Sequence, residues 1–269
     1  MNATHMLPEV VTDERAWSAD TVDAQASWFT SLSEDCLLEL ERWLAEHAAS
    51  SEEATTLRVL DAQLSRCREL LSPVTTELDA GRGFALIDGV PMERFSPSEA
   101  TAIYWLLGQI LGEPFKQDIR GTLLYDVRDT GQDVKQGARF SVTNAESSFH
   151  TDGAFNPQVP DYVGLLCLAV AKSGGESELV SAVSLHNELL ERDAEALRTL
   201  YGPFCFDRRG QFAAGEESVT ETPIFRWDGQ ELFHRYLHYY IRVGHELIGR
   251  PLSTELERAL EAVEALLKR

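Results

Sequence analysis

The spacing of apolar residues predicts amphipathic helices near both ends of the chain. Residues 33–48 carry leucines and a tryptophan at helical intervals, and residues 254–267 repeat such a stripe. A second N-terminal helix is expected over 52–72. We expect it to end at Pro73, because proline in a helix interior removes a backbone hydrogen bond.

Capping residues predict two further helices. Ser96 and Glu99 form a capping box around Pro97, which suits the first position of a helix. Ser184 opens another expected helix over 185–200. An N-terminal helical section over residues 1–80 is therefore expected to pack on a core of different character over 81–269.

Short apolar runs bounded by turn residues predict strands in that core. They cover residues 83–89, 122–128 and 163–170, and Asp228-Gly229 is a tight hairpin turn between two further runs. The strands do not alternate regularly with helices, so a doubly wound sheet is disfavoured. The pattern favours an α+β protein built on a β-sandwich or jelly roll.

Charge narrows the classes of partner. The chain has 269 residues with a net charge of −20, and residues 1–80 contain 16 acidic against 5 basic side chains. Nucleic-acid backbones and anionic membranes attract basic patches, so neither is expected as the main partner. A small-molecule substrate is expected instead.

Segment lengths and cysteine spacing indicate a cytoplasmic protein. No apolar run approaches the roughly 18 residues that span a bilayer, and the N-terminus lacks the pattern of a secretion signal. The cysteines lie far apart with no CxxC spacing, so we expect free thiols in a reducing cytosol and no disulfide framework. They are Cys36, Cys67, Cys167 and Cys205.

Candidate chemistry is concentrated in Ser148-Phe149-His150-Thr151-Asp152-Gly153. On an extended strand His150 and Asp152 point to the same side. An imidazole and a carboxylate on one side are two of the three ligands in the facial triad that holds non-haem Fe(II) and leaves positions open. Taken by itself, the tripeptide is also compatible with a surface His–Asp pair.

Longer segments carry a family resemblance. GRGFALIDGVP (81–91), GTLLYDVRDTG (121–131), RFSVTNAESSFHTD (139–152), SGGESELVSA (173–182) and FDRRGQ (206–211) follow one another in the expected order. Together they resemble the Fe(II)/2-oxoglutarate-dependent dioxygenases, in the group with taurine dioxygenase and clavaminate synthase-like enzymes. The resemblance implies a double-stranded β-helix (jelly roll) core with flanking helices.

The same resemblance implies cofactors and roles for individual residues. Fe(II) would be held by His150 and Asp152, with 2-oxoglutarate and O₂ as co-substrates. Ser177, after the Gly174-Gly175 turn, would donate a hydrogen bond to the distal carboxylate of 2-oxoglutarate. Asn144 would contact substrate. The alternatives are a serine in an exposed turn and an asparagine that bonds its own backbone.

The family's third iron ligand, a histidine, and the arginine that pairs with 2-oxoglutarate have no match in their usual context. We therefore expect both beyond Arg269, with the last strands of the core. His234 and His238 share one face and could form a metal pair, but partly exposed hairpin histidines are the simpler interpretation. His186 at a helix start and His245 in a loop are expected to be structural.

The implied function is an oxygenase that hydroxylates or desaturates an aliphatic carbon of a small polar substrate, such as an amino acid or amino-acid-derived metabolite. Asp152 argues against halogenation, because halogenases of this superfamily have a small residue there. The alternative is a non-catalytic or truncated member that binds ligand without turnover. The sequence does not identify the substrate or oligomeric state. Four arginines could meet a substrate carboxylate or be surface charges: Arg139, Arg208, Arg209 and Arg235.

Overall fold

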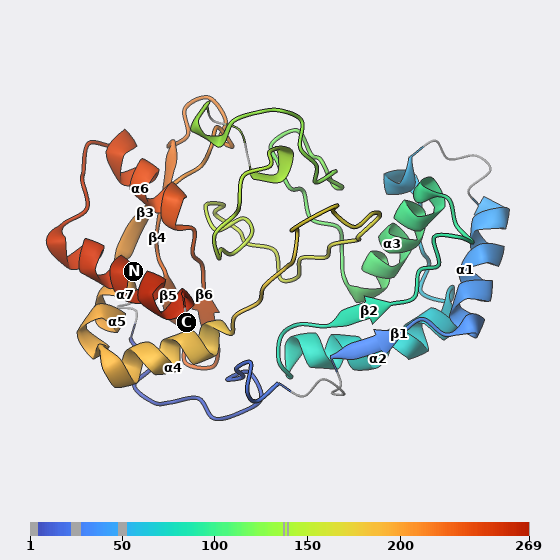
Figure 1. Ribbon diagram of the computed structural model, residues 1–269, viewed down its shortest axis with the longest axis horizontal. Helices are drawn as coiled ribbons and strands as arrows, with labels where there is room; N and C mark the ends of the chain where they lie inside the picture. The colour runs from blue at the N-terminus through green and yellow to red at the C-terminus, as the bar shows by residue number, and fades with distance from the viewer. Residues whose placement is uncertain (1–4, 23–27, 48–52, 137, 139, 269) are drawn as a thin grey trace. The chain divides into compact units, whose positions relative to one another are not determined.

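The protein divides into two compact units. The computed structural model describes residues 5–22, 28–47, 53–136, 138 and 140–268. Unit 1 comprises Met1–Ser18, Lys116–Asp161 and Glu178–Arg269, and unit 2 comprises Ala19–Phe115 and Tyr162–Ser177. The described residues form seven α-helices and six short strands, an α+β composition (Figure 1). The division at residue 80 stays a prediction.

Unit 2 is mainly helical. Its elements are β1 (Phe29–Ser31), α1 (Glu34–His47), the 3₁₀ turn η2 (Ala54–Thr56), α2 (Ser65–Asp79), β2 (Leu86–Asp88) and α3 (Pro97–Leu111). The two strands pair in parallel, with Thr30 opposite Ile87. α1 and α3 confirm the predicted helices. At α3, Ser96 and Glu99 exchange the two hydrogen bonds of a capping box.

The predicted helix over 52–72 is wrong in both boundaries. Residue 52 lies outside the described residues, and α2 starts at Ser65, after Leu64 adopts a left-handed conformation with φ 55°. The helix continues through Pro73 and ends at Asp79. Leu71 and Val74 are buried on either side of the proline, and this packing offsets the hydrogen bond that proline removes.

A disulfide corrects the prediction of four free thiols. Cys36 on α1 and Cys67 on α2 are both fully buried, and their Cα atoms lie 5.1 Å apart in a disulfide that joins the helices. Cys167 and Cys205 are free. The pairing depends on how two helices pack, which the 31-residue separation does not show. The expected cytoplasmic location therefore loses the support of four free thiols.

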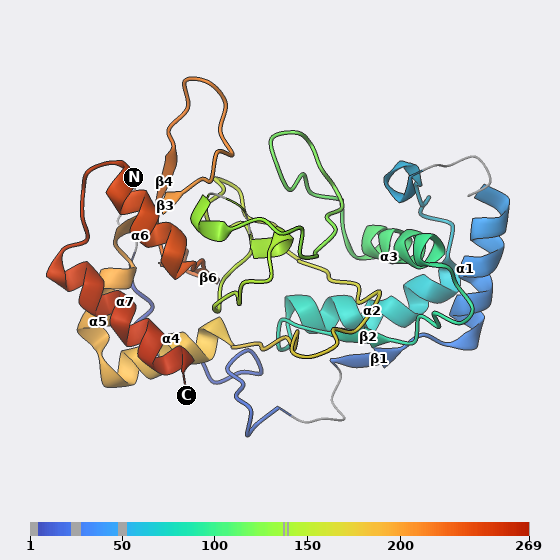
Figure 2. The same cartoon turned by 45° about the horizontal axis from the view of Figure 1, so that its top comes forward.

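Unit 1 packs helices around two antiparallel strand pairs. The elements are the 3₁₀ turns η3 (Val134–Gln136) and η4 (Phe140–Val142), α4 (Ala182–Arg192), α5 (Ala194–Leu200), β3 (Pro203–Asp207), β4 (Val219–Pro223), β5 (Phe225–Trp227), β6 (Leu232–His234), α6 (His238–Leu247) and α7 (Thr254–Leu267). α6 lies against β3 (Figure 2). Gly244 permits this approach, because a Cβ there would come within 2.3 Å of the Cys205 carbonyl oxygen.

The C-terminal predictions hold in part. The Asp228-Gly229 hairpin is confirmed by the pairing of β5 with β6, and the helix over 254–267 is α7. The helix predicted over 185–200 is two helices, because Asp193 ends α4 and caps α5 through the Ala196 N–H. His245 lies in α6 rather than in a loop.

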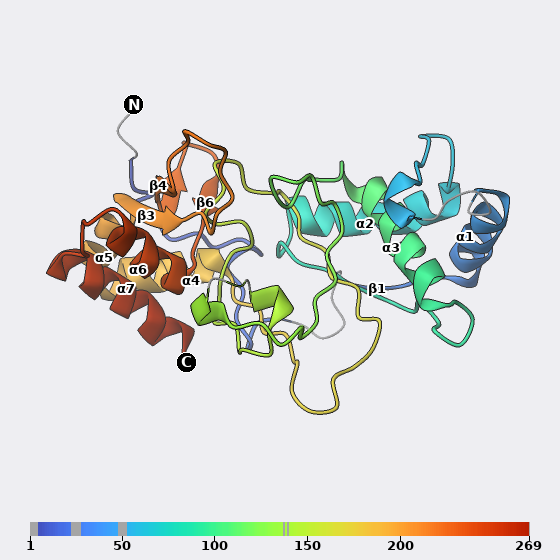
Figure 3. The ribbon, with the colours of Figure 1, turned by 90° about the horizontal axis from the view of Figure 1, so that it is seen from above.

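Two predicted strands are absent from the described structure. Residues 122–128 and 163–170 have no regular secondary structure, and Leu165 and Val170 are 74% and 87% exposed. Figure 3 shows the yellow segment over residues 163–170 as an open loop. The described strands form three separate pairs, so the jelly roll stays a prediction. No described helix is long and apolar enough to cross a membrane.

Candidate metal and co-substrate site

His150 and Asp152 lie in contact on a loop of unit 1. His150 Nε2 is 3.2 Å from Asp152 Oδ1, although the predicted strand is a loop at this point. The two side chains are 32% and 53% exposed, so a small ion can reach both. Sequence spacing therefore identified a pair that the structure brings together.

The backbone orients the imidazole ring. His150 Nδ1 lies 2.8 Å from the Ser148 carbonyl oxygen, which can only accept a hydrogen bond, so Nδ1 carries the proton. In the neutral ring, Nε2 then keeps its lone pair and faces Asp152. A metal-ligating histidine commonly has its other nitrogen hydrogen-bonded in this way.

The electrostatics of the pair fit a shared cation. The hydrogen bond to Asp152 raises the pKa of His150, and partial burial opposes this effect. In the charged ring, Nε2 donates to Asp152 and Nδ1 donates to Ser148. His150 and Asp152 are the residues that would hold a metal ion in place of the Nε2 proton. Imidazole nitrogen and carboxylate oxygen suit Fe(II). The described residues contain no group of three or more potential metal ligands, so this pair supplies two candidate ligands.

Burial of the following residues fixes the loop to the core of unit 1. Ala154 is fully buried and Phe155 nearly so, and the Phe155 ring lies 5.6 Å from that of Tyr240 on α6. Gly153 makes the intervening turn with φ +65°, a conformation that favours glycine.

The other two predicted site residues, Asn144 and Ser177, belong to different units. Asn144 is an exposed residue of unit 1, six positions before His150. Ser177 is an exposed residue of unit 2, after Gly174 and Gly175 with φ +73° and +84°. No turn or bend is assigned at residues 174–177, so the predicted glycine turn stays a prediction. The contacts of both residues with co-substrate or substrate stay predictions.

Four later histidines of unit 1 contact other side chains or the backbone. His186 Nε2 lies 3.0 Å from the Tyr201 hydroxyl, and His238 Nδ1 lies 3.2 Å from Glu264 Oε1. His245 Nε2 accepts from the Cys205 N–H at 3.1 Å. His234 packs on Phe225, with ring centroids 4.7 Å apart. The hairpin interpretation is wrong for His238, which begins α6, whereas His234 ends β6. The Nε2 atoms of both residues are buried without a hydrogen-bond partner among the described residues, and the alternative metal pair stays untested.

The candidate arginines are also held within the protein. Arg208 pairs with Glu216, and the buried Arg209 pairs with Asp207. Arg235 donates to two backbone carbonyls within the loop over 148–156, which we name the metal-ligand loop after its two candidate ligands. Arg139 lies outside the described residues. Sequence reasoning missed the anchoring role of Arg235, because no local pattern links it to residues about 80 positions earlier.

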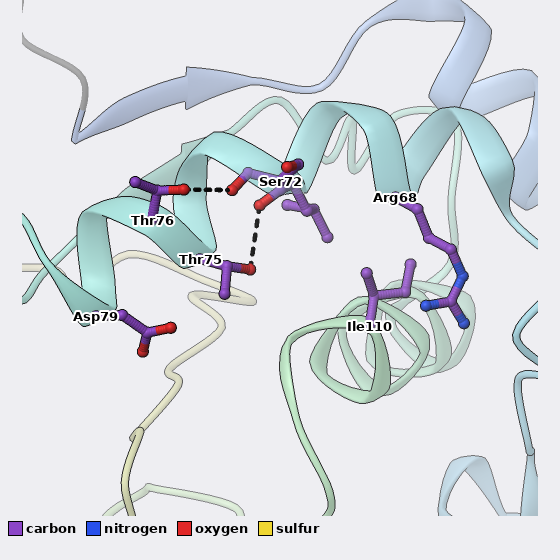
Figure 4. Close-up of a pocket in the computed structure, with 7 residues that line it drawn as sticks. Arg68, Ser72, Thr75, Thr76, Asp79 and Ile110 are labelled. Atoms are coloured by element: carbon purple, nitrogen blue, oxygen red, sulfur yellow. Dashed lines mark hydrogen bonds between the residues drawn. The ribbon is translucent and has the colours of Figure 1, made fainter.

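An open hollow in unit 2 lies away from the candidate ligands. It has a volume of about 350 Å³ and lies between α2 and Ile110 of α3 (Figure 4). Arg68 on its wall already donates to the Gln63 and Leu60 carbonyls. A second hollow, of about 220 Å³, lies between α4 and the end of α7. Neither is lined by His150 or Asp152.

Comparison with known proteins identifies the family. Residues 38–269 match the family described as taurine catabolism dioxygenase TauD, TfdA family. The chain is also 28% identical over 270 residues to FR-33289 synthase of Streptomyces rubellomurinus (strain ATCC 31215). That alignment covers 98% of this chain and 77% of the relative. The chain therefore belongs to the TauD/TfdA family, whose members use Fe(II), 2-oxoglutarate and O₂.

Proposed function

We propose that this protein is an Fe(II)/2-oxoglutarate-dependent oxygenase that hydroxylates or desaturates an aliphatic carbon of a small polar molecule. An amino acid or a metabolite derived from one is the proposed substrate class. The observation that carries this proposal is the contact of His150 Nε2 with Asp152 Oδ1 at 3.2 Å, within a chain of the TauD/TfdA family.

Each site residue has a proposed task. His150 and Asp152 hold iron, Ser177 donates a hydrogen bond to the distal carboxylate of 2-oxoglutarate, and Asn144 contacts substrate. Bound iron, with 2-oxoglutarate and O₂, supplies the oxidising chemistry. For hydroxylation, R–H, 2-oxoglutarate and O₂ give R–OH, succinate and CO₂. One atom of O₂ enters the product and the other enters succinate.

One feature supports hydroxylation or desaturation rather than halogenation. Asp152 would supply a carboxylate to the metal, whereas halogenases of the superfamily have a small residue at that position. The similarity to a protein named FR-33289 synthase supports an enzymatic role for this chain.

The proposed partner and location follow from charge. With a net charge of −20, the protein repels nucleic-acid backbones and anionic membrane surfaces, which favours a small-molecule partner. We propose a cytoplasmic location on the basis of the sequence pattern alone.

Anaerobic titration followed by turnover tests the function. Purified protein is mixed with Fe(II) and 2-oxoglutarate without O₂, and the weak visible charge-transfer band of the chelate is recorded. Air and a panel of amino acids are then added, and succinate and products with one added oxygen are quantified by mass spectrometry. Chelate formation with substrate-dependent succinate supports the proposal. Absence of the chelate band overturns it.

A ligand-binding protein without turnover is the second candidate. It is favoured by one observation, that the described residues offer two metal ligands and no group of three. The same experiment separates the two functions. Formation of the chelate band with no succinate above the iron-only background, across the whole panel, supports binding without turnover.

A further inference from the structure

The metal-ligand loop is tied to the end of β6 through the residue between the two ligands. The Thr151 N–H donates to the Tyr236 carbonyl oxygen at 2.7 Å, and the Tyr236 N–H donates to Thr151 Oγ1 at 3.3 Å. Tyr236 is itself almost fully buried, and its hydroxyl donates to Glu264 on α7 at 2.6 Å. The position of Thr151 is therefore set by the core of unit 1.

The neighbouring Arg235 holds the other end of the loop. Its Nη1 donates to the carbonyl oxygens of Asn156 at 3.0 Å and Ala154 at 3.3 Å. Between these two, the Phe155 carbonyl accepts from Thr220 Oγ1 on β4 at 2.5 Å. The three consecutive carbonyls of residues 154–156 are therefore held by side chains from β4 and from the segment that follows β6.

Arg235 makes its contacts as a hydrogen-bond donor to backbone carbonyls and not as a partner in an ion pair. The described residues give it no carboxylate within ion-pair distance, in contrast to Arg208 and Arg209. Burial lowers the pKa of Arg235, and the charge of Arg226 lowers it further. A partly buried guanidinium beside another cation costs stability. The two carbonyl contacts that fix the turn after Asp152 offset this cost.

We propose that Arg235 is a positioning residue for the metal site, which holds the 154–156 backbone so that His150 and Asp152 converge on one ion. This inference rests on the proposed function. The two ligands precede a turn whose start is fixed by Tyr236 and whose end is fixed by Arg235. Loss of the guanidinium frees the carbonyls of Ala154 and Asn156 and lets the Asp152 carboxylate move away from the imidazole.

Co(II) binding under anaerobic conditions tests the proposal without turnover. The affinity is measured by visible absorption titration, and the spectrum of the saturated protein reports the ligand geometry. Arg235→Ala is expected to weaken Co(II) binding about tenfold, as outer-sphere partners of metal ligands commonly do, and to change the spectrum. Arg235→Lys should recover part of the affinity, since one ammonium can reach a single carbonyl.

Arg226→Ala is the matched control. Arg226 lies across from β6 and places its guanidinium 3.8 Å from the centroid of Phe233, so the variant removes the same charge without touching the loop. We expect its affinity to stay within twofold of the unmodified protein. All titrations are run well below the urea or thermal midpoint of each variant. If Arg235→Ala does not fold, the affinity and spectrum of Arg235→Lys decide.

The outcomes separate this inference from the proposed function. If the unmodified protein binds Co(II), His150→Ala does not, and Arg235→Ala matches the unmodified protein in affinity and spectrum, the positioning role is refuted and the ligand pair stands. If the unmodified protein fails to bind Co(II), both are refuted. A tenfold loss in Arg235→Ala with Arg226→Ala unaffected supports the positioning role.

Discussion

Two segments close in sequence, the metal-ligand loop over 148–156 and the apolar segment over 162–180, differ in burial in the opposite sense to what their composition predicts. The loop carries polar residues, yet its Ala154 and Phe155 enter the core of unit 1 and its backbone has several long-range hydrogen bonds. The apolar segment is exposed along most of its length. Two long-range hydrogen bonds hold its first residues within unit 2, from the Tyr162 hydroxyl to Asp79 and from the Tyr104 hydroxyl to the Gly164 carbonyl.

The difference lies in the availability of partners. A strand with apolar residues on both faces is stable only when neighbouring strands satisfy its backbone and other layers cover its faces. No described residue gives the apolar segment a strand partner. The loop needs no ladder, because side chains of Arg235 and Thr220 satisfy its carbonyls one at a time. The hydrophobic pattern of a segment alone therefore does not predict how well packing and hydrogen bonds fix its position.

The largest expected effect comes from the loop. Asp152→Ala removes one of two proposed ligands, so we expect 2-oxoglutarate-coupled succinate formation to fall at least about 100-fold. The fold should be retained, because the Asp152 side chain is 53% exposed. The rate is measured by succinate release, and folding by far-ultraviolet circular dichroism.

Asp161→Ala is the control for Asp152→Ala, because it removes an exposed carboxylate further along the same connection. It should keep the full rate. Undiminished turnover in Asp152→Ala would remove that residue from the ligand set.

The next effect contrasts the two segments directly. Phe155→Ala deletes a ring that packs in the core of unit 1, so we expect a loss of about 3 kcal/mol in the free energy of unfolding. Leu165→Ala truncates a side chain that is 74% exposed, and we expect a change within about 0.5 kcal/mol. Urea denaturation measures both. Equal losses would show that residues 162–180 are buried in solution and would reverse the contrast.

The fold was predictable where local pattern and packing agree. α1, α3 and α7 follow from their apolar stripes, and α3 also from the Ser96 cap. Pattern failed where tertiary contacts decide: α2 continues through Pro73, and Cys36 meets Cys67 only after two helices pack. The 163–170 run failed for the same reason, since a strand requires a neighbour.

The site was predictable to the extent that its residues are close in sequence. His150 and Asp152 are two positions apart, so their contact follows from one short motif. Arg235 and Tyr236 reach the same loop from the segment that follows β6, and nothing near either residue in the sequence indicates these contacts. Residues that position a site but lie far from it in the sequence can be recognised only in the structure.

Acid should weaken the core that holds the loop. Burial lowers the pKa of His186 to about 4, and its Nδ1 has no partner among the described residues, so protonation would leave a charge unpaired. In the unfolded chain the pKa is about 6.5, so the unfolded state binds the extra proton between these values. Stability is therefore complete above about pH 6.5 and falls by up to about 3 kcal/mol as the pH drops to about 4.

Urea midpoints measured across this pH range test the dependence. His234, whose pKa burial also lowers to about 4, adds to the slope. His186→Gln should flatten the curve. A slope that is the same in His186→Gln and in the unmodified protein would show that His186 does not titrate in this window.

The smallest effect is expected at the far end of the apolar segment. If Ser177 donates a hydrogen bond to the distal carboxylate of 2-oxoglutarate, Ser177→Ala removes one bond to a charged group. We expect the KM for 2-oxoglutarate to rise about tenfold, with kcat unchanged at saturation.

Ser173→Ala, four positions earlier in the same exposed segment, is the matched control and should leave the KM unaltered. An unchanged KM in Ser177→Ala would favour the alternative of an ordinary serine in a glycine turn. A rise confined to Ser177 would mean that the segment without a strand partner still supplies a co-substrate contact. Function would then depend on its turn, although its apolar residues are exposed.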